Sequence, residues 1–465
     1  MLCGARFSFF EILLFRKEPG FLCYNIRMGR NASDLLEKTL DGPRLELLHL
    51  LAYQAAMQRM PLYLVGGVVR DILMGRQLKD FDLVVEGASA TFAEDIVKKY
   101  GGRVLIHSKF GTATWMLNES TFKRLNVPMF QSPDSPLSFD LVSARSETYE
   151  HPGALPTVKR SSIDDDLRRR DFTINAMAIR LDGDHFGELF DPLDGSGDLE
   201  HKLIRVLHPK SFMDDPTRIL RAARYVGRYA FQLETDTRKL INGESRAILM
   251  NLSGERLRHE FDLIFEEKNA LVMLDELDRV EVLQLIHPVL RPVMYRSPLD
   301  YSLTDDLSEI VLPNMLSFHQ TLAWIMWLIS LQAKEIEVIA KRLAFPSLLT
   351  KATLGAARLY AEFPAHIAQN DSQKTFYFDG FPLLSVYAVW VFASWDNSYK
   401  QILANYLSQW RHVKPHTNGY DLKNLGLEPG PRFAEILRQL RAAWLDGEIK
   451  TEAQEKKLLE QILRG

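Results

Sequence analysis

Apolar positions in the first third of the chain follow two different periods. Residues 44–59 carry apolar side chains at helical spacing, and Pro61 ends the predicted helix. Short β-rich runs then follow up to about residue 145, with one further helix near 90–100. The runs are LYLVG (62–66), FDLVVEG (81–87), GRVLIH (102–107), TATWML (112–117) and SFDLVSA (138–144). The pattern predicts an α/β module built on a small mixed sheet.

Helical patterns dominate from Asp164 onward. Short strands are predicted at 176–181 and 203–208, and after about residue 210 almost nothing is strand-like. The proline-rich segment 287–313 and the segment 415–432 are the predicted breaks. The predicted fold class is therefore α+β, with a small mixed sheet followed by an all-α extension.

The amino-acid composition is that of an ordinary globular protein with several domains. The chain has 465 residues, 46% of them hydrophobic, which is enough for two to four domains with real cores. Its net charge is only −3, so a nucleic-acid partner would need local basic regions. Both cysteines, Cys3 and Cys23, precede Met28, which argues against disulfides, zinc and a cysteine nucleophile and fits a reducing, cytoplasmic compartment. Glu11 interrupts the apolar stretch 7–15, so no targeting signal is expected.

The segment 62–87 contains the first candidate chemistry. Gly66 and Gly67 stand between an apolar strand and a helix, where backbone N–H groups and the positive helix end favour a phosphate. Asp80 and Asp82 lie two residues apart on the next strand and so share a face, while Phe81 faces the core. Two carboxylates side by side suit Mg²⁺. Together these features indicate a site for a metal-bound nucleotide.

Asp140 is a third carboxylate, placed on the apolar strand SFDLV. Its neighbours Phe139 and Leu141 would face the opposite side of the sheet. An aspartate in this setting needs a partner. It either belongs to the site, or caps a sheet edge, or pairs with an arginine.

The segment 164–179 concentrates charge directly before an apolar stretch. Asp164 is expected to cap a helix start, and Arg168, Arg169 and Arg170 follow it. Arginines at this place would hold phosphates bidentately, and Asp171 would accept from a ribose hydroxyl. The alternative is a solvated charged face.

A one-sided arginine stripe is predicted in the segment 214–228. Pro216 fits the first turn of a helix, and Asp214 and Asp215 suit its positive end. The stripe falls within an arc of about 120° and consists of Arg218, Arg221, Arg224 and Arg228. Such a face would satisfy base edges and phosphates, and an Asp–Arg pair offers donors and acceptors for Watson–Crick edges. A helix laced with salt bridges is the alternative.

Near the C-terminus, Gly426, Gly430 and Pro431 predict a tight turn into a helix. The free N–H groups of that helix would hold an RNA phosphate, with Arg432 adjacent. The alternative is an ordinary helix start.

These blocks, in this order, resemble the class II tRNA nucleotidyltransferase and bacterial poly(A) polymerase family, which includes the CCA-adding enzymes. The resemblance rests on GGVVRD with DFD, RRDFTINAMA, FDPLDGSGDLEHKLIRVL, DDPTRILRAARY and SGERLRHEF, and covers residues from about 40 to 290. One departure is Asp214, where the family commonly has Glu. The segment 418–440 is similar to the part that many members place against tRNA.

The resemblance implies a polymerase-β-like head followed by helical neck, body and tail. The expected parts are a leader that is disordered or a mis-assigned start (1–27), a head (28–182), a neck with the base-reading helix (183–285), a body (286–410) and a tRNA-contacting tail (411–465). The implied reaction is attack of an RNA 3′-hydroxyl on the α-phosphate of ATP or CTP. The implied partners are the tRNA 3′ end, ATP and CTP, with no membrane and no obligate protein partner.

The resemblance also distributes roles among residues of this chain. Two Mg²⁺ ions would be held by Asp80 and Asp82, and Asp140 completes the candidate catalytic set. The candidate nucleotide-binding residues are Gly66, Gly67, Arg70, Arg170, Asp171, Asn175, Asp215, Arg218, Arg221 and Arg224. The candidate RNA-binding residues are Gly430 and Arg432.

Specialisation is harder to predict, because family members add CCA, only CC, only A, or long A tails. The segment 143–163, taken as the flexible stretch between the first two motifs, looks full length, which by resemblance disfavours CC-only addition. CCA addition is therefore the expectation, with A-only, CC-only and poly(A) addition as alternatives. A nucleotidyltransferase with a non-RNA substrate would not need the long helical extension, and an RNA-binding pseudoenzyme should have lost Asp80 or Asp82.

Overall fold

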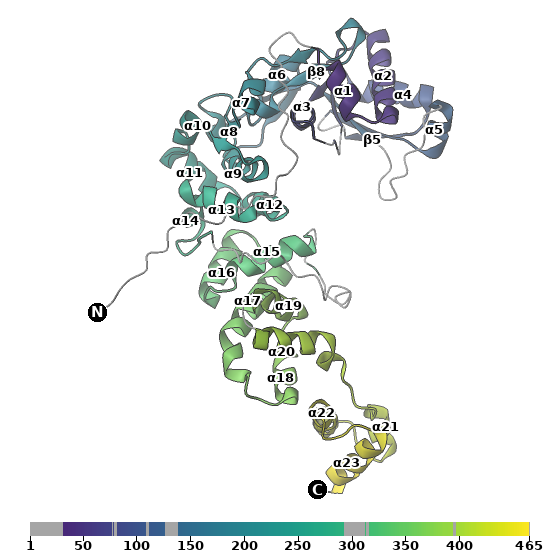
Figure 1. Cartoon of the computed structure of the whole chain (residues 1–465), viewed down its shortest axis with the longest axis vertical. Coiled ribbons are helices and arrows are strands. Elements are labelled where there is room, and N and C mark those ends of the chain that lie inside the picture. The colour runs from purple at the N-terminus through teal and green to yellow at the C-terminus, as the bar shows by residue number, and fades with distance from the viewer. Residues whose placement is uncertain are drawn as a thin grey trace, which may run out of the picture. The chain divides into compact units, whose positions relative to one another are not determined.

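In the computed structural model, the described residues are 31–76, 78, 81–107, 111–125, 138–292, 312, 316–393 and 397–464. The chain divides into two compact units (Figure 1). The first unit runs to Arg218 and includes Tyr229–Leu240, and the second comprises Ile219–Arg228 and Ile241–Gly465. The division passes twice through α9 (Thr217–Tyr229).

A seven-stranded sheet forms the first unit. Its strands lie in the order β3-β4-β5-β2-β1-β8-β9. Their bounds are β1 (Leu62–Val65), β2 (Asp82–Val85), β3 (Arg103–His107), β4 (Thr112–Met116), β5 (Ser138–Ser143), β8 (Ala178–Arg180) and β9 (Leu189–Phe190). Strands β2 and β5 are parallel and the other neighbours are antiparallel. The predicted mixed sheet is therefore confirmed, although the strand predicted at 176–181 is shorter.

One face of the sheet is covered by α4 (Ser89–Tyr100), which packs against β3, β4 and β5. Alternation along β5 explains this packing, because Phe139 and Leu141 are buried while Asp140 between them is exposed. The Phe139 ring contacts Trp115 and Phe81, at centroid distances of 6.0 and 5.3 Å. The expectation that Phe81 faces the core is confirmed.

On the opposite face of the sheet, α6 packs against β1 and β2 and forms a second hydrophobic core. Tyr63, Val65 and Val84 pack with Ile163 and Leu167 of α6 (Ile163–Arg168). Asp82 lies two residues before Val84 on the same strand and therefore points to the same face. This face of the sheet is therefore apolar where it packs against α6 and carries an acidic side chain, Asp82, at the start of β2.

The remaining elements of the first unit are short. Two small sheets pair β6 (Arg145–Thr148) with β7 (Thr157–Arg160) and β10 (Leu203–Ile204) with β11 (Gln232–Leu233). The strand predicted at 203–208 is thus only two residues long. The other helices are α1 (Ser33–Thr39), α2 (Gly42–Met57), α3 (Gly67–Leu73), α5 (Glu119–Leu125), the 3-10 turn η2 (Thr173–Asn175), α7 (Gly195–Glu200), α8 (Ser211–Asp214) and α10 (Thr235–Lys239).

Within the residues described, the second unit contains helices and no strand, as predicted. Its helices are α11 (Gly243–Asn251), α12 (Gly254–Phe265), α13 (Ala270–Arg279), α14 (Val282–Ile286), α15 (Phe318–Leu328), α16 (Ala333–Arg342), α17 (Ser347–Glu362), α18 (Asp371–Phe378), α19 (Leu383–Phe392), α20 (Asn397–Ser408), α21 (Gly419–Asn424), α22 (Pro431–Leu445) and α23 (Glu452–Arg464). The helix α21 interrupts the predicted break at 415–432, because Asn418 supplies a capping box there. Most of the other predicted break, 287–313, lies outside the described residues.

An aromatic cluster joins α12 to α15. Phe265 and Trp324 meet edge to face at 4.7 Å, and Phe261 stacks on Trp327 at 5.5 Å. The indole N–H of Trp324 donates to the Asp262 carboxylate at 2.7 Å. Burial raises the pKa of Asp262 above its usual range, although the hydrogen bond from Trp324 and the charges of Arg258 and His259 oppose the shift.

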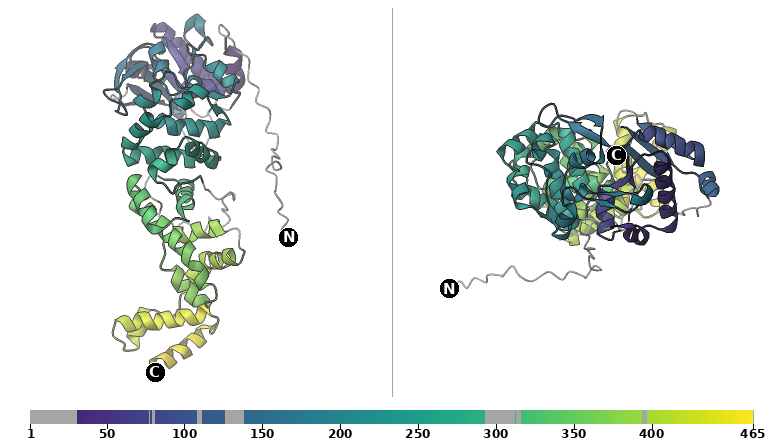
Figure 2. Two further views of the ribbon diagram at one scale, coloured as in Figure 1. Left: turned by 90° about the vertical axis from the view of Figure 1, so that its left-hand side faces the viewer. Right: turned by 90° about the horizontal axis from the view of Figure 1, so that it is seen from above.

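The last three helices share a separate small core. Leu422 of α21, Ile436 and Leu440 of α22 and Leu459 of α23 pack together, and α22 and α23 lie side by side in the left view of Figure 2. Asp446, which follows α22, accepts from Asn370 and Ser372 at the start of α18. These hydrogen bonds fasten the end of α22 to α18.

The predicted division into leader, head, neck, body and tail remains a prediction, and the leader 1–27 lies outside the described residues. In the part of the chain that the structure describes, no single helix is long and apolar enough to cross a membrane. The pair α18 and α19 meets that criterion only when taken together, and the two helices are bent by 115° at the break.

Asp262→Asn should change how stability depends on pH. Because the pKa of Asp262 is raised in the folded protein, its proton stabilises the fold at low pH, and that stabilisation is lost as pH rises through the raised pKa. Asparagine keeps an acceptor for Trp324 and carries no charge. The Tm of the variant relative to wild type should therefore rise as the pH increases from about 4, the ordinary pKa of aspartate, through the raised pKa of Asp262. A Tm difference between Asp262→Asn and wild type that stays constant over this range would contradict this account.

Candidate active site

The glycine pair follows β1 directly and opens α3. Gly66 is the residue before the helix, with φ of +69°, and its N–H donates to the carbonyl of Met177 at 3.0 Å. A Cβ at this position would collide with Nη1 of Arg170. Position 66 therefore needs glycine for two reasons, its left-handed backbone and the close approach of a guanidinium.

Arg70 projects from α3 into a buried polar cluster. Its guanidinium donates to Asn175 at 2.6 Å and to both oxygens of Asp71 at 3.0 Å. The same group lies 4.6 Å from the ring centroid of Tyr229, and Arg76 lies 4.8 Å from that ring. Arg70 is almost fully buried, so in this structure it braces α3 against η2.

Asn175 and Asp171 complete this cluster. The amide of Asn175 donates to Oδ1 of Asp171 at 2.8 Å, and the same oxygen accepts the N–H of Phe172 at 2.9 Å. Both side chains are buried. The structure thus brings together the predicted residues Gly66, Gly67, Arg70, Arg170, Asp171 and Asn175.

Asp166, which the sequence did not single out, holds the arginine run in place. It is 0% exposed, and its two oxygens accept from Arg169 at 2.8 and 3.0 Å and from Arg170 at 2.9 Å. Nη1 of Arg170 also reaches the carbonyl of Asn175 at 3.5 Å. A buried carboxylate of this kind is satisfied only when its arginines stay in place.

The expected helix cap at Asp164 is wrong. The capping residue of α6 is Ser162, whose hydroxyl accepts from the N–H of Asp165. Asp164 lies in the first turn and pairs with Arg168 at 2.7 Å, and both side chains are exposed. A serine two residues earlier has the extended backbone that a cap requires. The alternative of a solvated charged face is therefore correct for Arg168, whereas Arg169 and Arg170 pair with the buried Asp166.

The carboxylates lie at the same end of the sheet as the glycine pair. Leu64 pairs with Leu83 in the antiparallel β1–β2 ladder, so the end of β1 meets the start of β2. Asp82 pairs directly with Asp140 in the parallel ladder to β5, which places both on one face, about 5 Å apart between strands. Oδ1 of Asp140 accepts from the Thr114 hydroxyl at 2.6 Å. Asp140 therefore joins Asp82 and does not pair with an arginine among the residues described.

The third predicted carboxylate, Asp80, lies outside the described residues. Among the residues that are described, no group of three histidine, cysteine, aspartate or glutamate side chains is gathered closely enough to hold a metal ion. Asp82 and Asp140 supply hard oxygen donors, the type that Mg²⁺ prefers. The donor set present therefore fits a divalent magnesium ion and does not favour a thiophilic metal.

Asp215 and Arg218 stand at the start of α9. Oδ1 of Asp215 accepts from the N–H and hydroxyl of Thr217, at 3.1 and 2.7 Å, and so orders the first turn of α9. Arg218 is 4% exposed, and its Nη2 donates to the carbonyl of Arg169 at 2.8 Å. Within the described part of the chain, its Nη1 is buried without a hydrogen-bond partner. A buried donor of this kind is available to a ligand.

The rest of the arginine stripe belongs to the second unit. Arg228 pairs with Glu267, and Arg224 is buried with its guanidinium 5.6 Å from the Tyr225 ring. Arg221 is half-buried. Because these residues lie in another unit than Asp215 and Arg218, the predicted nucleotide contacts of Arg221 and Arg224 remain predictions.

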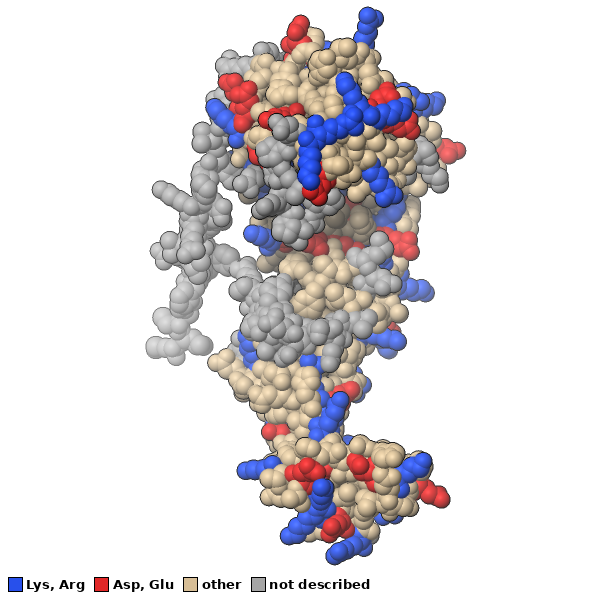
Figure 3. All heavy atoms as spheres, turned by 90° about the vertical axis from the view of Figure 1, so that its right-hand side faces the viewer, with Lys and Arg blue, Asp and Glu red and all other residues tan. Residues whose placement is uncertain are grey.

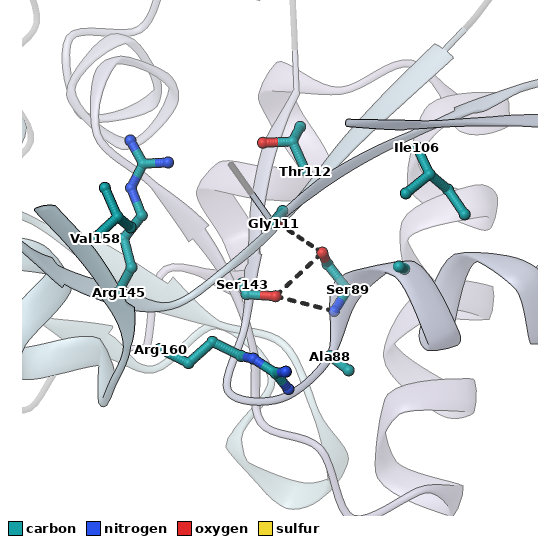
Figure 4. Close-up of a pocket in the computed structure, with 10 residues that line it drawn as sticks. Ala88, Ser89, Ile106, Gly111, Thr112, Ser143, Arg145, Val158 and Arg160 are labelled. Carbon is teal, nitrogen blue, oxygen red and sulfur yellow. Dashed lines mark hydrogen bonds between the residues drawn. The ribbon is translucent and has the colours of Figure 1, made fainter. Parts of the chain in front are cut away.

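A cavity of about 340 Å³ lies at the other end of β5 (Figure 4). Ser89, at the start of α4, donates to Ser143 and to the carbonyl of Gly111 across its floor, and Arg145 and Arg160 line it. Ser143 is three residues from Asp140, so the cavity is about 10 Å along the strand and on the opposite face. It is therefore separate from the carboxylates.

The predicted RNA contacts near the C-terminus sit on a helix start. Gly430 precedes α22, Pro431 is its first residue and Arg432 is exposed, as the sequence predicted. On the face shown in Figure 3, lysine and arginine side chains are interspersed with aspartate and glutamate.

Comparison with known proteins places the chain in a family. Residues 62–205 match the sequence model of the Poly A polymerase head domain, and residues 230–294 match that of a probable RNA and SrmB-binding site of polymerase A. The chain is 35% identical over 429 residues to the A-adding tRNA nucleotidyltransferase of Halalkalibacterium halodurans, covering 90% of this chain and 93% of that protein. The chain belongs to the class II tRNA nucleotidyltransferase family.

Other members of this tRNA nucleotidyltransferase family are similar along most of the chain. The A-adding tRNA nucleotidyltransferase of Geobacter sulfurreducens is 32% identical over 452 residues, which cover 92% of this chain and 48% of that longer protein. The structure of the Thermotoga maritima CCA-adding enzyme complexed with tRNA superposes with a TM-score of 0.68 at 28% identity, covering 94% of this chain and 99% of that one. The predicted resemblance is therefore confirmed.

Four residues of this nucleotidyltransferase site were not predicted: Thr114, Asp166, Arg169 in its buried role, and Tyr229. Each acts through a partner distant in sequence or through burial that spacing does not reveal. Only Asp166 could have been found from the sequence. It precedes Arg169 by three residues and Arg170 by four, and on a helix these spacings predict ion pairs. No sequence pattern pointed to Thr114 or Tyr229.

Gly66→Ala should inactivate the nucleotidyltransferase without unfolding it. The added methyl group displaces Arg170, and a displacement of about 1 Å costs about 100-fold in rate. Gly183→Ala is a matched control, because Gly183 also has a positive φ but meets no described atom within 4 Å. Rates of nucleotide incorporation and Tm of both variants should be measured. Equal incorporation by the two variants would remove the steric role assigned to position 66.

Proposed function

We propose that the chain transfers AMP from ATP to the 3′ end of tRNA without a nucleic-acid template. In this reaction the terminal 3′-hydroxyl attacks the α-phosphate, the bond between the α- and β-phosphates breaks, and pyrophosphate leaves. The observation that carries the proposal is the meeting of Gly66, Arg170 and the Asp82–Asp140 pair at one end of the sheet. Phosphate-binding groups and acidic ligands are needed together for this chemistry.

Mg²⁺ would be held by Asp80 and Asp82, and Asp140 lies opposite Asp82 on the neighbouring strand. When bound, such ions lower the pKa of the attacking hydroxyl and neutralise charge on the leaving group. The Thr114 hydroxyl orients one oxygen of Asp140. The N–H of Gly66 donates to Met177, so the triphosphate would approach the backbone at Gly67, the first residue of α3. Arg170 supplies positive charge, and its ion pair with Asp166 holds the guanidinium in one place.

Asp215 and Arg218 would select the base. A carboxylate and a guanidinium present both acceptors and donors to a Watson–Crick edge. The free buried Nη1 of Arg218 supports this role, because the described residues leave it without a partner. Selection by side chains replaces selection by a template strand.

Addition of A alone is the specialisation that we propose, in place of the CCA addition that the sequence suggested. The two relatives described above match nine-tenths of this chain and both are named A-adding. CCA addition is the second candidate, because a CCA-adding enzyme has a similar structure over 94% of the chain. Gly430 and Arg432 at the start of α22 would contact a tRNA phosphate.

Product length should separate the two candidates. The chain would be incubated with tRNAs ending before CCA or after CC, each with CTP, ATP or both, and the products sized. One added residue, only on tRNA ending in CC and only with ATP, is the expected result. Three residues added to the shorter tRNA would establish CCA addition instead, and a long ladder with ATP would establish poly(A) synthesis. No product from any tRNA would reject the proposed reaction.

Asp80→Ala and Asp82→Ala should each lower incorporation by at least about 1000-fold, because several kcal/mol of charge stabilisation is lost. Binding of tRNA should stay within a factor of about two, since neither residue is assigned to RNA. Asp95→Ala, on the surface of α4, is the control and should retain activity. Near-normal turnover by Asp80→Ala would refute the metal assignment.

A further inference from the structure

Arg70, Asn175 and Asp171 form one continuous chain of buried hydrogen bonds. Nη1 of Arg70 donates to Oδ1 of Asn175 at 2.6 Å, and Nδ2 of Asn175 donates to Oδ1 of Asp171 at 2.8 Å. The exposed fractions of the three residues are 5%, 5% and 7%. Among groups buried this deeply a hydrogen bond is strong, and the loss of a partner destabilises the group that remains. The orientation of the Asp171 carboxylate therefore depends on Arg70.

The chemistry of the three side chains fixes the direction of this chain. A guanidinium only donates and a carboxylate only accepts, so the amide of Asn175 must accept with its oxygen and donate with its nitrogen. The charges of Arg70 and Asp171 polarise the amide in the same sense and so strengthen both hydrogen bonds. The N–H of Phe172 donates to the same Oδ1 of Asp171 at 2.9 Å. These two bonds hold one oxygen of Asp171, and they determine which way the carboxylate faces.

The guanidinium of Arg70 is itself held by other protein groups. Its Nε and Nη2 donate to the two oxygens of Asp71, both at 3.0 Å. A Cβ at position 67 would lie 3.2 Å from Nη2, so Gly67 leaves just enough room for the guanidinium. All three nitrogens of Arg70 therefore donate to protein acceptors, which favours a positioning role over direct contact with a phosphate.

Tyr229 packs its ring against the same guanidinium. The ring centroid lies 4.6 Å from Arg70 and 4.8 Å from Arg76, and Tyr229 is 3% exposed. The face of an aromatic ring attracts cations, and more strongly where water is excluded. Tyr229 belongs to the same compact unit as both arginines. It therefore restricts where the Arg70 guanidinium can lie.

We propose that Tyr229 and Arg70 are positioning residues for recognition of the ribose, which act on Asp171 through Asn175. This inference rests on the proposed function, and it deepens the expected contact between Asp171 and a ribose hydroxyl. Neither Tyr229 nor Arg70 touches the nucleotide. They keep the Asp171 carboxylate oriented to accept a hydrogen bond from the 2′-hydroxyl, which a ribonucleotide has and a deoxyribonucleotide lacks.

The test compares kcat/KM for ATP and dATP on tRNA ending in CC. Tyr229→Leu should lower the preference for ATP over dATP about fivefold, the scale of one buried cation–π interaction. Tyr229→Phe keeps the ring and should keep the preference. Phe231→Leu is the matched control, because Phe231 is also buried and its ring lies 5.7 Å from that of Tyr229. Its preference should equal that of wild type.

Arg70→Lys tests the next step of the chain. Lysine keeps the positive charge but cannot bind Asp71 and Asn175 with one rigid planar group. The preference for ATP over dATP should fall about tenfold, the scale of one charge-assisted hydrogen bond.

The two nucleotides separate a positioning role from a contact with phosphate. ATP and dATP carry the same triphosphate, so loss of a triphosphate ligand lowers kcat/KM for both by the same factor. Under the proposal, Tyr229→Leu and Arg70→Lys lower kcat/KM for ATP and leave that for dATP nearly unchanged. Equal falls for the two nucleotides would overturn the proposal, and an accompanying drop in Tm would assign those falls to a weakened fold.

Asp171→Ala provides the decisive background. If Tyr229 acts through Asp171, adding Tyr229→Leu to Asp171→Ala will not change the preference for ATP over dATP further. Additive losses of preference would overturn the proposal. So would an Asp171→Ala variant that prefers ATP as strongly as wild type, because no ribose contact would then need positioning.

Failure of the proposed function would look different. In that case wild-type protein would not extend the tRNA with either nucleotide. A wild type that extends tRNA and prefers ATP over dATP through Asp171, combined with Tyr229→Leu and Arg70→Lys variants that prefer it equally, would reject only the inference about Tyr229 and Arg70.

Discussion

The buried carboxylate of Asp166 is the interaction on which the arrangement of the site depends. It binds Arg169 and Arg170 with its two oxygens and is shielded from water. Removing Asp166, or one of these two arginines, would leave a buried charge without its partner, and this lowers the stability of the fold. The arginines are therefore ordered before any substrate arrives. A preorganised positive site stabilises charge that develops during reaction without first having to rearrange.

Elements that depend on local pattern were predicted well. The sheet strands and α4 follow directly from alternation and helical spacing, and the predicted glycine pair and Asp82 lie at the same end of the sheet. Helix bounds were less certain, as α6 illustrates. Asp164 and Ser162 are both good capping residues, and only backbone geometry decides between them.

Contacts between distant segments were beyond prediction from spacing alone. The Tyr229 ring contacts both Arg70 and Arg76, and no hydrophobic periodicity of the sequence predicts these contacts with the first unit. The hairpin formed by 145–160 was expected to be flexible, because the family resemblance implies a flexible stretch between the first two motifs. On this hairpin Glu147 pairs with Arg169 at 2.9 Å, and the two residues become neighbours only when α6 folds beside the hairpin. Arg70 was predicted from the sequence only as a nucleotide-binding residue. In the fold its guanidinium contacts Asp71, Asn175 and Tyr229, and spacing alone did not predict these contacts.

The contrast between buried and exposed arginines has a consequence for ionic strength. Salt screens exposed charges strongly and buried pairs weakly. Arg169 and Arg170 are held by an inaccessible carboxylate, whereas Arg432 is exposed at a helix start. Contacts between surface arginines and a polyanion weaken steeply as counterions accumulate. If Arg432 binds RNA as proposed, added salt should therefore weaken that binding at concentrations that leave the ion pairs of Arg169 and Arg170 with Asp166 intact.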